Sequence, residues 1–336
     1  MTLDDMMLMS NLSEDALAQA KGVVETHLDA TPLVRLPESL APGIERELWA
    51  KLETVQPTGS FKVRGAIAAT AAYAAEGVPI VTASAGNHGL GMAHAASTLG
   101  VRTTIVVPQT ASSSKIDALR AFDTDLRLIG NSYDEAEQAA LEMAAQGGRF
   151  VSAYNDARVI AGQASLTSEL LQQLPETLRD GFVLAVPVGG GGLMSGSLLA
   201  ARNHPEVRVV GVEAAASTAV SAAAHEGRVV PVSVLPTIAD GLAGNIEFDA
   251  VAPTLIRASS SHMVAVNEPS IRGAVGDLVT RAGLAVEGSA AVGLAAIQEG
   301  LIPGSDPIVL ILTGRNIASE LLAQLVAEAA AKRVIR

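Results

Sequence analysis

The sequence predicts an α/β protein with two open, mostly parallel sheets covered by helices. Short apolar runs alternate with helical patterns along most of the 336 residues, and this alternation is typical of parallel strands joined by helices. Hydrophobic residues make up 49% of the chain and charged residues 17%, which indicates a densely packed globular protein. Because only 3% of the residues are aromatic, small aliphatic side chains must fill the core.

Each expected element has local support in the sequence. An apolar stretch at 48–52 runs into a Pro-Gly turn, and an Ala-rich helix follows it. Further along, Gly100 closes one helix, Pro108 ends one strand, and Gly147 with Gly148 ends another helix. The expected strands are 78–83, 102–107, 126–129, 183–188, 207–212 and 308–312, and the expected helices are 88–99, 113–122, 132–145 and a long one after Ala157.

The spacing of these elements predicts two domains. Regular short units between residues 76 and 152 indicate a small domain, inserted into a larger one formed by 1–75 and 153–336. A chain of this length exceeds a single typical core, which agrees with that division.

Composition excludes several classes of partner. A net charge of −12 leaves no basic stripe for nucleic acid, and the absence of cysteine excludes disulfides and zinc-cysteine sites. Asp4 and Asp5 stand where a signal peptide needs positive charge. The uncharged stretch 182–201 contains Pro187 and four glycines, so it reads as strand, loop and helix instead of a membrane span. We therefore expect a cytoplasmic protein without a membrane partner.

The segment Gln56-Pro57-Thr58-Gly59-Ser60-Phe61-Lys62 carries a lysine on the first turn of a helix. Phe61 and Val63 flank Lys62, and the run 66–69 is apolar. A lysine desolvated in this way has a lowered pKa, which frees its amine as a nucleophile toward an aldehyde. A lysine at a helix start that reaches water is the alternative on this segment alone.

The run Val188-Gly189-Gly190-Gly191-Gly192-Leu193 follows a strand and opens a helix. Glycines at this place let backbone N–H groups converge on an anion at the helix N-terminus, as a phosphate requires. A rival interpretation is a dinucleotide fingerprint, with Glu213 as the ribose-binding acid 21 residues beyond Gly192. That alternative predicts an NAD-dependent oxidoreductase, but it gives Lys62 no role.

Two further polar turns follow expected strands. Ser84-Ala85-Gly86-Asn87-His88-Gly89 offers a run of backbone N–H groups for a carboxylate and an amide for a ring hydroxyl. Ordinary helix capping explains the same turn if it is taken alone. The second turn is Leu312-Thr313-Gly314-Arg315-Asn316.

Together, the motifs PTGSFKVRGA, SAGNHG, VGGGGL and TGRN resemble the fold-type II pyridoxal-phosphate enzymes, in order and at about their spacings. Within that family the chain is most similar to the threonine/serine dehydratase and serine racemase group. The resemblance implies a tryptophan-synthase-β-like fold, a large domain that binds pyridoxal 5'-phosphate, a small domain that binds substrate, and a homodimer.

The resemblance also implies roles for individual residues. Lys62 would carry the cofactor as a Schiff base with Phe61 beside the ring, and Asn87 would meet the ring hydroxyl. Gly189, Gly190, Gly191, Gly192 and Leu193 would bind the phosphate. Thr313 would meet the pyridine nitrogen and Glu287 would lie near the cofactor. Ser84, Ala85, Gly86, Asn87 and His88 would bind the substrate carboxylate.

The implied reaction is β-elimination from a β-hydroxy amino acid such as threonine or serine, giving a 2-keto acid and ammonia, which is ammonia-lyase activity of the EC 4.3.1 type. Lys62 would take the Cα proton, and a hydroxyl at Thr313 favours elimination over transamination. Alternatives are a larger substrate such as hydroxyaspartate, phenylserine or a hydroxyectoine-derived amino acid, a racemase, and a catalytically silent relative.

Departures from the family pattern refine this expectation. Ala85 replaces the serine that serves racemases as the second acid/base, so racemisation is disfavoured. Ala219 replaces an aspartate of the family's divalent-metal site at Glu213, and we expect no tight metal there. Arg315 replaces a common glycine and is a candidate for reading a second carboxylate on the substrate, a surface ion pair being the alternative. Gly288 replaces a proline beside Glu287.

Overall fold

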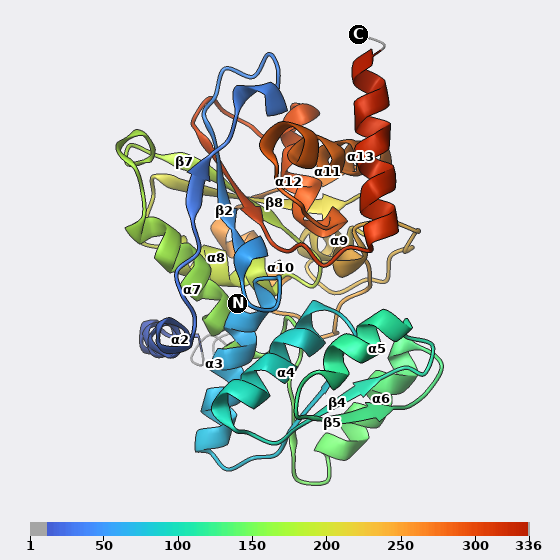
Figure 1. Cartoon of the computed structure of the whole chain (residues 1–336). Coiled ribbons are helices and arrows are strands. Elements are labelled where there is room, and N and C mark those ends of the chain that lie inside the picture. Colours follow the sequence, from blue (N-terminus) through green and yellow to red (C-terminus); the bar gives the residue numbers. More distant parts are fainter. Residues whose placement is uncertain (1–11, 335–336) are drawn as a thin grey trace. The chain divides into compact units, whose positions relative to one another are not determined.

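The computed structural model describes residues 12–334, which form two compact units (Figure 1). Within that range the large unit comprises residues 31–55 and 167–334, and the small unit comprises residues 12–30 and 56–166. The domain limits expected at residues 76 and 152 stay a prediction. Asp4 and Asp5, on which the argument against a signal peptide depends, lie outside the described residues.

The large unit is built on a six-stranded sheet in the order β1-β2-β10-β7-β8-β9. Strand β1 runs antiparallel to β2, and every other neighbouring pair is parallel. Strand β10 therefore lies in the middle of the sheet although it comes last in sequence. The strands are β1 Leu33–Arg35, β2 Leu48–Leu52, β7 Phe182–Pro187, β8 Val207–Ala214, β9 His262–Val266 and β10 Ile308–Leu312.

Helices cover both faces of this sheet (Figure 1). Helix α12 packs on β7, β8, β9 and β10, and α11 packs on α12 and α13. On the other face α8 packs on β7 and β8, and α10 packs on α8 and α9. The helices are α8 Gly192–Ala201, α9 Ala219–Glu226, α10 Ala252–Ser259, α11 Glu268–Ala282, α12 Gly288–Gln298 and α13 Ser319–Val334.

The small unit contains a parallel four-stranded sheet in the order β5-β4-β3-β6. Alternate residues of its strands face opposite layers: Ile80 and Ile105 join the core formed with α3 and α4, whereas Val81 and Val106 pack with α6. The strands are β3 Ile80–Ala83, β4 Thr103–Val107, β5 Asp125–Leu128 and β6 Arg149–Phe150. The helices are α2 Glu14–His27, α3 Lys62–Ala75, α4 Asn87–Leu99, α5 Ser113–Arg120 and α6 Tyr133–Ala144. Helix α7, Ala157–Gln172, begins in the small unit and ends in the large one.

Two classes of local signal place the helix ends. Ser132 and Asn267 precede α6 and α11, and each side chain accepts a hydrogen bond from a backbone amide of the first turn. Gly100 ends α4 in the left-handed region at φ 66°, where glycine is favoured. Small residues also permit close helix packing, because a Cβ at Gly162 of α7 would lie 2.6 Å from the Cβ of Ala68 in α3. The predicted α/β class with two mostly parallel sheets is confirmed.

A fully buried lysine lies in the large unit. Lys51 is 0% exposed, and its Nζ donates to Glu169 Oε1 at 2.5 Å and to the Thr31 carbonyl at 2.7 Å. Thr31 Oγ1 donates in turn to Glu53 Oε1 at 2.7 Å. Pairing of this kind is what allows a charged amine to remain buried. Thr31, Glu53 and Glu169 each lie within three residues of a point where the chain crosses between units.

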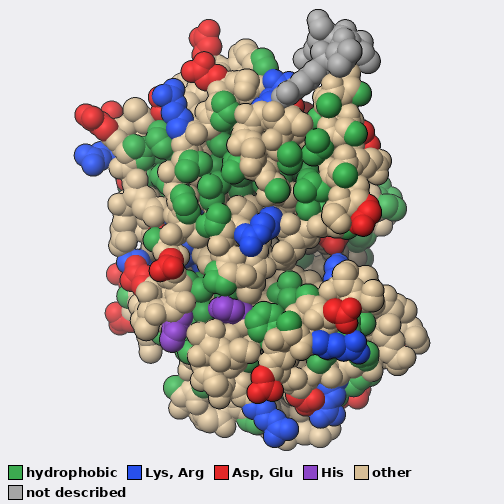
Figure 2. Space-filling view, viewed as in Figure 1, with side chains coloured by type: hydrophobic (Ala, Val, Ile, Leu, Met, Phe, Trp, Pro, Cys, Tyr) green, Lys and Arg blue, Asp and Glu red, His purple; other side chains and the backbone are tan. Residues whose placement is uncertain are grey.

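The uncharged stretch 182–201 forms β7, the glycine turn and α8, as predicted. None of the helices within residues 12–334 combines the length and the apolar character needed to cross a bilayer. On the face drawn in Figure 2, basic and acidic side chains are interspersed.

Candidate functional site

Lys62 is the first residue of α3 in the small unit. Its side chain is half-buried, and Nζ donates a hydrogen bond to the Ala153 carbonyl at 2.8 Å. The same nitrogen lies 5.2 Å from the centre of the Phe61 ring. A Cβ built at Gly91 would lie 3.2 Å from the backbone of Lys62, so α4 packs closely against the start of α3. A backbone carbonyl therefore helps to hold the amine in place.

The loop after β6 receives hydrogen bonds from two predicted site residues. Lys62 donates to Ala153, and His88 Nε2 lies 3.2 Å from the Val151 carbonyl. Because a carbonyl only accepts, Nε2 carries the hydrogen and Nδ1 is left as an acceptor. That Nδ1 is buried without a hydrogen-bond partner among the described residues. Burial first, and the charge of Lys62 second, lower the pKa of His88 to about 3, so the ring is neutral at physiological pH.

The other end of this loop is anchored by Tyr73 of α3. Its hydroxyl donates to Asp156 Oδ2 at 2.5 Å, and burial together with the Asp156 carboxylate raises the pKa of Tyr73 above its usual value. Asp156 Oδ1 also accepts from the amides of Arg158 and Val159 at the start of α7. The Arg158 guanidinium stacks on the Tyr73 ring at 3.8 Å. Residues 151–156 are therefore fixed at both ends by side-chain contacts.

The turn Ser84–Gly89 joins β3 to α4, as predicted. Ser84 Oγ accepts from the Gly86 amide at 3.2 Å, and Asn87 and His88 open the helix. A Cβ at Gly89 would lie 2.1 Å from the Ser84 carbonyl oxygen, so only glycine fits there. Ala85 presents a methyl group in this turn and has no proton to give.

In the large unit, the glycine turn connects β7 to α8. Gly191 takes the left-handed conformation at φ 86° and precedes the first residue of α8, Gly192. A Cβ at Gly191 would lie 2.3 Å from the Cβ of Ala252, and a Cβ at Gly189 would lie 2.9 Å from the Gly241 carbonyl oxygen. The backbone of the turn therefore leaves no room for a side chain. The first turn of α8 adds the positive end of a helix dipole.

A second group of predicted residues meets in the large unit. Glu287 is buried and precedes α12, and its Oε2 accepts from the Asn316 amide at 3.2 Å. The Glu287 amide donates to the Gly314 carbonyl at 3.0 Å. Thr313, directly after β10, is 3% exposed. Glu287 and the turn 313–316 thus form one assembly, which the sequence separation of these residues does not reveal.

Arg315 projects from that turn and is exposed. No carboxylate of the described residues lies within ion-pair distance of its guanidinium, so the expected surface ion pair is not formed there.

The dinucleotide alternative required Glu213 to reach a ribose. The structure buries this carboxylate to 1% exposure at the end of β8, and Oε1 accepts from the amides of Val220 and Ser221 at 3.0 and 3.2 Å. Glu213 therefore caps α9. Burial raises the pKa of Glu213, and its Oε2 has no hydrogen-bond partner among the described residues.

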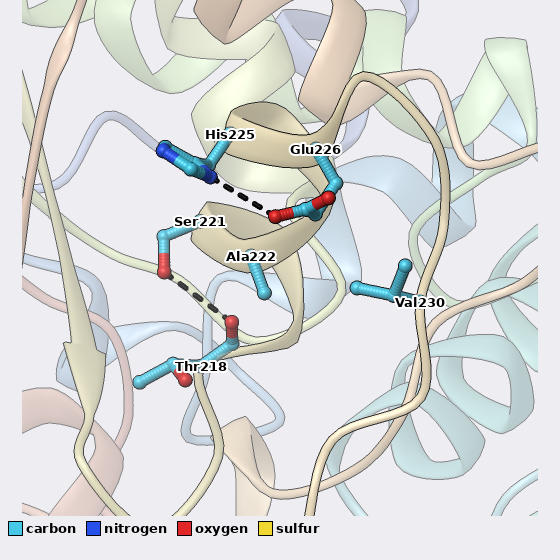
Figure 3. A pocket seen from close by; sticks show the side chains of 6 residues that line it. All are labelled: Thr218, Ser221, Ala222, His225, Glu226 and Val230. Atoms are coloured by element: carbon cyan, nitrogen blue, oxygen red, sulfur yellow. Dashed lines mark hydrogen bonds and ion pairs between the residues drawn. The ribbon is translucent and has the colours of Figure 1, made fainter.

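A surface pocket of about 580 Å³ lies beside α9 (Figure 3). Thr218, Ser221, Ala222, His225, Glu226 and Val230 line it, and none of them is a predicted site residue. Among the described residues no three His, Asp or Glu side chains form a metal-binding group. The expectation that no divalent ion binds tightly at Glu213 stays a prediction.

Sequence reasoning missed two features of the site. The Ala153 carbonyl is a backbone group, and a sequence pattern does not mark it. The segment 237–242, described further below, packs on both the glycine turn and the start of α12. It is mostly irregular, so no periodicity indicates it. The Asp240-Gly241 pair predicts only a turn.

Comparison with known proteins gives a consistent result. Residues 24–314 match the family model described as "Pyridoxal-phosphate dependent enzyme". The L-threonine ammonia-lyase of Thermotoga maritima is 39% identical over 279 residues, which cover 81% of this chain and 67% of that protein.

Solved structures agree with the sequence comparison. The processed form of threonine deaminase isoform 2 from Solanum lycopersicum has a TM-score of 0.83 at 30% identity, covering 95% of this chain and 90% of the other. Maize serine racemase has a TM-score of 0.84 at 27% identity, covering 95% and 98%.

Proposed function

The chain belongs to the family of pyridoxal-phosphate-dependent enzymes, and from that premise we propose that it converts a β-hydroxy amino acid, threonine or serine, to a 2-keto acid and ammonia. The observation that carries this proposal is the Lys62 amine, half-buried at the start of α3 and held 2.8 Å from the Ala153 carbonyl. The relatives named as threonine ammonia-lyase and threonine deaminase support the choice of substrate class.

The residues present fit the cofactor. Pyridoxal phosphate offers an aldehyde, a ring with a nitrogen and a hydroxyl, and a phosphate. Lys62 supplies an amine for the aldehyde. The turn at Gly189–Leu193 supplies backbone amides in a cradle that a Cβ at Gly189 or Gly191 would obstruct. We assign the ring nitrogen to the Thr313 hydroxyl and the ring hydroxyl to Asn87.

When bound, the cofactor withdraws electrons from the substrate Cα and makes its proton acidic. The Lys62 amine then acts as the general base for that proton. The turn at Ser84–His88 holds the substrate carboxylate through its amides, and the neutral ring of His88 adds no charge. The Thr313 hydroxyl is too weak an acid to keep the ring nitrogen protonated, which favours loss of the β-hydroxyl over transamination.

Ala85 argues for elimination over racemisation. Inverting Cα requires a second acid/base on the opposite face from Lys62, and a methyl group cannot move a proton. A chiral assay with L-serine should therefore show keto acid with little D-serine. Interconversion of L- and D-serine faster than keto-acid formation would contradict this assignment.

Arg315 supports a second candidate, a β-hydroxy amino acid with a further carboxylate such as hydroxyaspartate. The guanidinium is exposed and has no ion-pair partner among the described residues, so it is available for a carboxylate. The variant Arg315→Gly should lose activity on hydroxyaspartate by about tenfold or more and keep its activity on threonine. Equal effects on both substrates would remove Arg315 from the specificity argument.

The test of the main proposal uses Lys62→Ala. The wild-type protein should show a borohydride-sensitive visible absorption band and form keto acid from threonine, serine, phenylserine or hydroxyaspartate. Lys62→Ala should lose the band and the activity together, since no other amine replaces its chemistry. Full activity in that variant would refute the proposal.

The proposal includes a homodimer in the cytoplasm, as the family resemblance and composition predict. Light scattering during gel filtration should give a mass of about twice the 34.3 kDa of the chain. A monomeric mass for the active enzyme would contradict the dimer.

A further inference from the structure

The segment 237–242 lies between two parts of the cofactor side of the large unit. It follows a stretch without helix or strand and includes a short 3-10 turn at Asp240–Leu242. Ala239 within it is fully buried. Segments of irregular backbone that are packed in this way usually have a positioning or binding role.

One end of the segment supports the glycine turn. The Gly241 carbonyl oxygen and the Leu242 Cα each lie 2.9 Å from the position of a Cβ at Gly189. The two backbones are therefore in direct contact, with no side chain between them. A shift of Gly241 or Leu242 would be transmitted to Gly189 without attenuation by a flexible side chain.

The other end supports the start of α12. A Cβ at Gly288 would lie 2.3 Å from the Ile238 carbonyl oxygen and 2.9 Å from the Ala239 amide nitrogen. Gly288 follows Glu287, which binds the turn at Gly314 and Asn316. This contact also gives a physical reason for a glycine at 288, since a side chain there would meet the Ile238 carbonyl.

The carboxylate of Glu268 anchors the segment by side-chain hydrogen bonds. Glu268, the first residue of α11, accepts from the Ile238 amide at 3.0 Å through Oε1 and from Thr237 Oγ1 at 2.6 Å through Oε2. Thr237 Oγ1 in turn accepts from the Ala239 amide at 3.0 Å. Hydrogen bonds to an ionised carboxylate are among the stronger ones in proteins.

We propose that Glu268 is a positioning residue for the cofactor phosphate, acting through Thr237 and the 237–242 segment on the backbone of the glycine turn. The hydrogen bonds of Glu268 go to Thr237 and Ile238 and not to Gly189 or the start of α8. Glu268 therefore acts on the glycine turn indirectly, through the segment. The inference rests on the assignment of Gly189–Leu193 to the phosphate.

The experiment compares two ligands of the cofactor-free protein: pyridoxal phosphate and pyridoxal, which lacks the phosphate. Equilibrium titration followed by absorbance gives both dissociation constants for the wild type and for Glu268→Ala, Thr237→Val and Thr237→Ser. Glu320→Gln is the control, because it removes an exposed carboxylate from α13 of the same unit.

Glu268→Ala and Thr237→Val should weaken pyridoxal phosphate binding by about tenfold or more and change pyridoxal binding by less than about threefold. Thr237→Ser keeps the hydroxyl and should bind both ligands like the wild type, as should Glu320→Gln. A loss of affinity that is equal for both ligands, or no loss in either variant, would overturn the inference. If Glu268→Ala does not fold, the comparison of Thr237→Val with Thr237→Ser tests the inference alone.

The wild type separates this inference from its premise. If the wild type binds pyridoxal phosphate no more tightly than pyridoxal, the phosphate assignment fails, and with it the role of Glu268. If the wild type prefers the phosphate and Glu268→Ala keeps that preference, only the inference about Glu268 fails. The ³¹P resonance of bound pyridoxal phosphate is a second readout, and it should shift in Glu268→Ala.

Discussion

The glycine turn of the large unit, here the glycine side, and the surroundings of Lys62 in the small unit, here the lysine side, are held in different ways. On the glycine side, Gly189 and Gly288 lie directly against backbone and Gly191 lies against the Ala252 methyl group, so none of the three has space for a Cβ. On the lysine side, side chains reach carbonyls: Lys62 donates to Ala153 and His88 to Val151. The first arrangement depends on residues that have no side chain, and the second on side chains that donate to backbone carbonyls.

This difference indicates how each side tolerates change. A backbone that is already in tight contact cannot take up an added methyl group unless one of the two packed segments moves. Replacing such a glycine by alanine should therefore be costly in free energy. A hydrogen bond from a side chain contributes about 1 kcal/mol on average, and the rest of the loop keeps its place when that bond is lost. The predictions below test this difference, beginning with the largest expected effect.

Gly191→Ala should have the largest effect of the changes considered, a loss of affinity for pyridoxal phosphate. The added Cβ would approach Ala252 Cβ to 2.3 Å and would also force alanine to φ 86°. We expect the affinity for pyridoxal phosphate to fall by about a hundredfold, measured by titration of the cofactor-free protein. The control is Gly300→Ala, which imposes a similar φ of 70° with no atom within 4 Å. An equal loss in both variants would mean that conformation, and not contact, sets the affinity.

His88 should make the free energy of unfolding depend on pH in the acid range. The folded protein keeps this ring neutral with a pKa of about 3, whereas the unfolded chain takes up a proton near pH 6.5. Stability should therefore fall as the pH falls below 6.5, by about 1.5 kcal/mol between pH 6.5 and 5.

The measurement is the free energy of unfolding in urea at these two pH values. His88→Gln keeps a donor for Val151 and should remove this part of the pH dependence. The exposed His225 serves as control, and His225→Gln should leave the slope unchanged. An unchanged slope in His88→Gln would show that His88 is not the titrating group.

Tyr73→Phe should have a smaller effect, because it removes one hydrogen bond from the anchor of the 151–156 loop. Asp156 keeps its bonds to the start of α7 and the ring keeps its contact with Arg158. We expect a loss of about 1 kcal/mol in unfolding free energy. Tyr133→Phe removes an exposed hydroxyl that donates to Glu137 and should change stability by less than about 0.5 kcal/mol. If Tyr73→Phe lost as much unfolding free energy as Gly191→Ala loses in the same urea measurement, the distinction between the two sides would be contradicted.

Magnesium should have the smallest effect. One oxygen of Glu213 is engaged by the amides of α9, and Ala219 offers no carboxylate. Millimolar magnesium should therefore leave the melting temperature and the activity unchanged, and a chelator should not inactivate the enzyme. Inactivation by chelator with rescue by magnesium would show that a divalent site exists.

Local patterns predicted much of the fold. Apart from β6, which was not predicted, the strands and helices between β3 and α8 were placed to within a few residues. Gly100, Pro108 and the glycine turn made this possible, because glycine and proline restrict where a helix or strand can end. The antiparallel pairing of β1 and the central place of β10 are not encoded locally. Strand order depends on which apolar faces meet in the folded chain, and spacing along the sequence does not give it.

The site shows the same limit. Gly191 and Lys62 were predicted because glycine runs and flanked lysines are unusual in themselves. Among the described residues Lys51 is the most deeply buried lysine, and the sequence argument did not single it out although the apolar residues Ala50 and Leu52 flank it. The hydrogen bonds of Glu268 also escaped prediction, because its partners Thr237 and Ile238 lie about thirty residues earlier in an irregular segment.

The central place of β10 in the sheet affects how the chain folds during its synthesis. Until residues 308–312 have left the ribosome, β2 and β7 each present an unpaired edge and the part of α12 that packs on β10 stays uncovered. The small unit, complete at residue 166, can fold long before that moment. Nascent chains paused shortly before β10 should therefore be the species most dependent on chaperones.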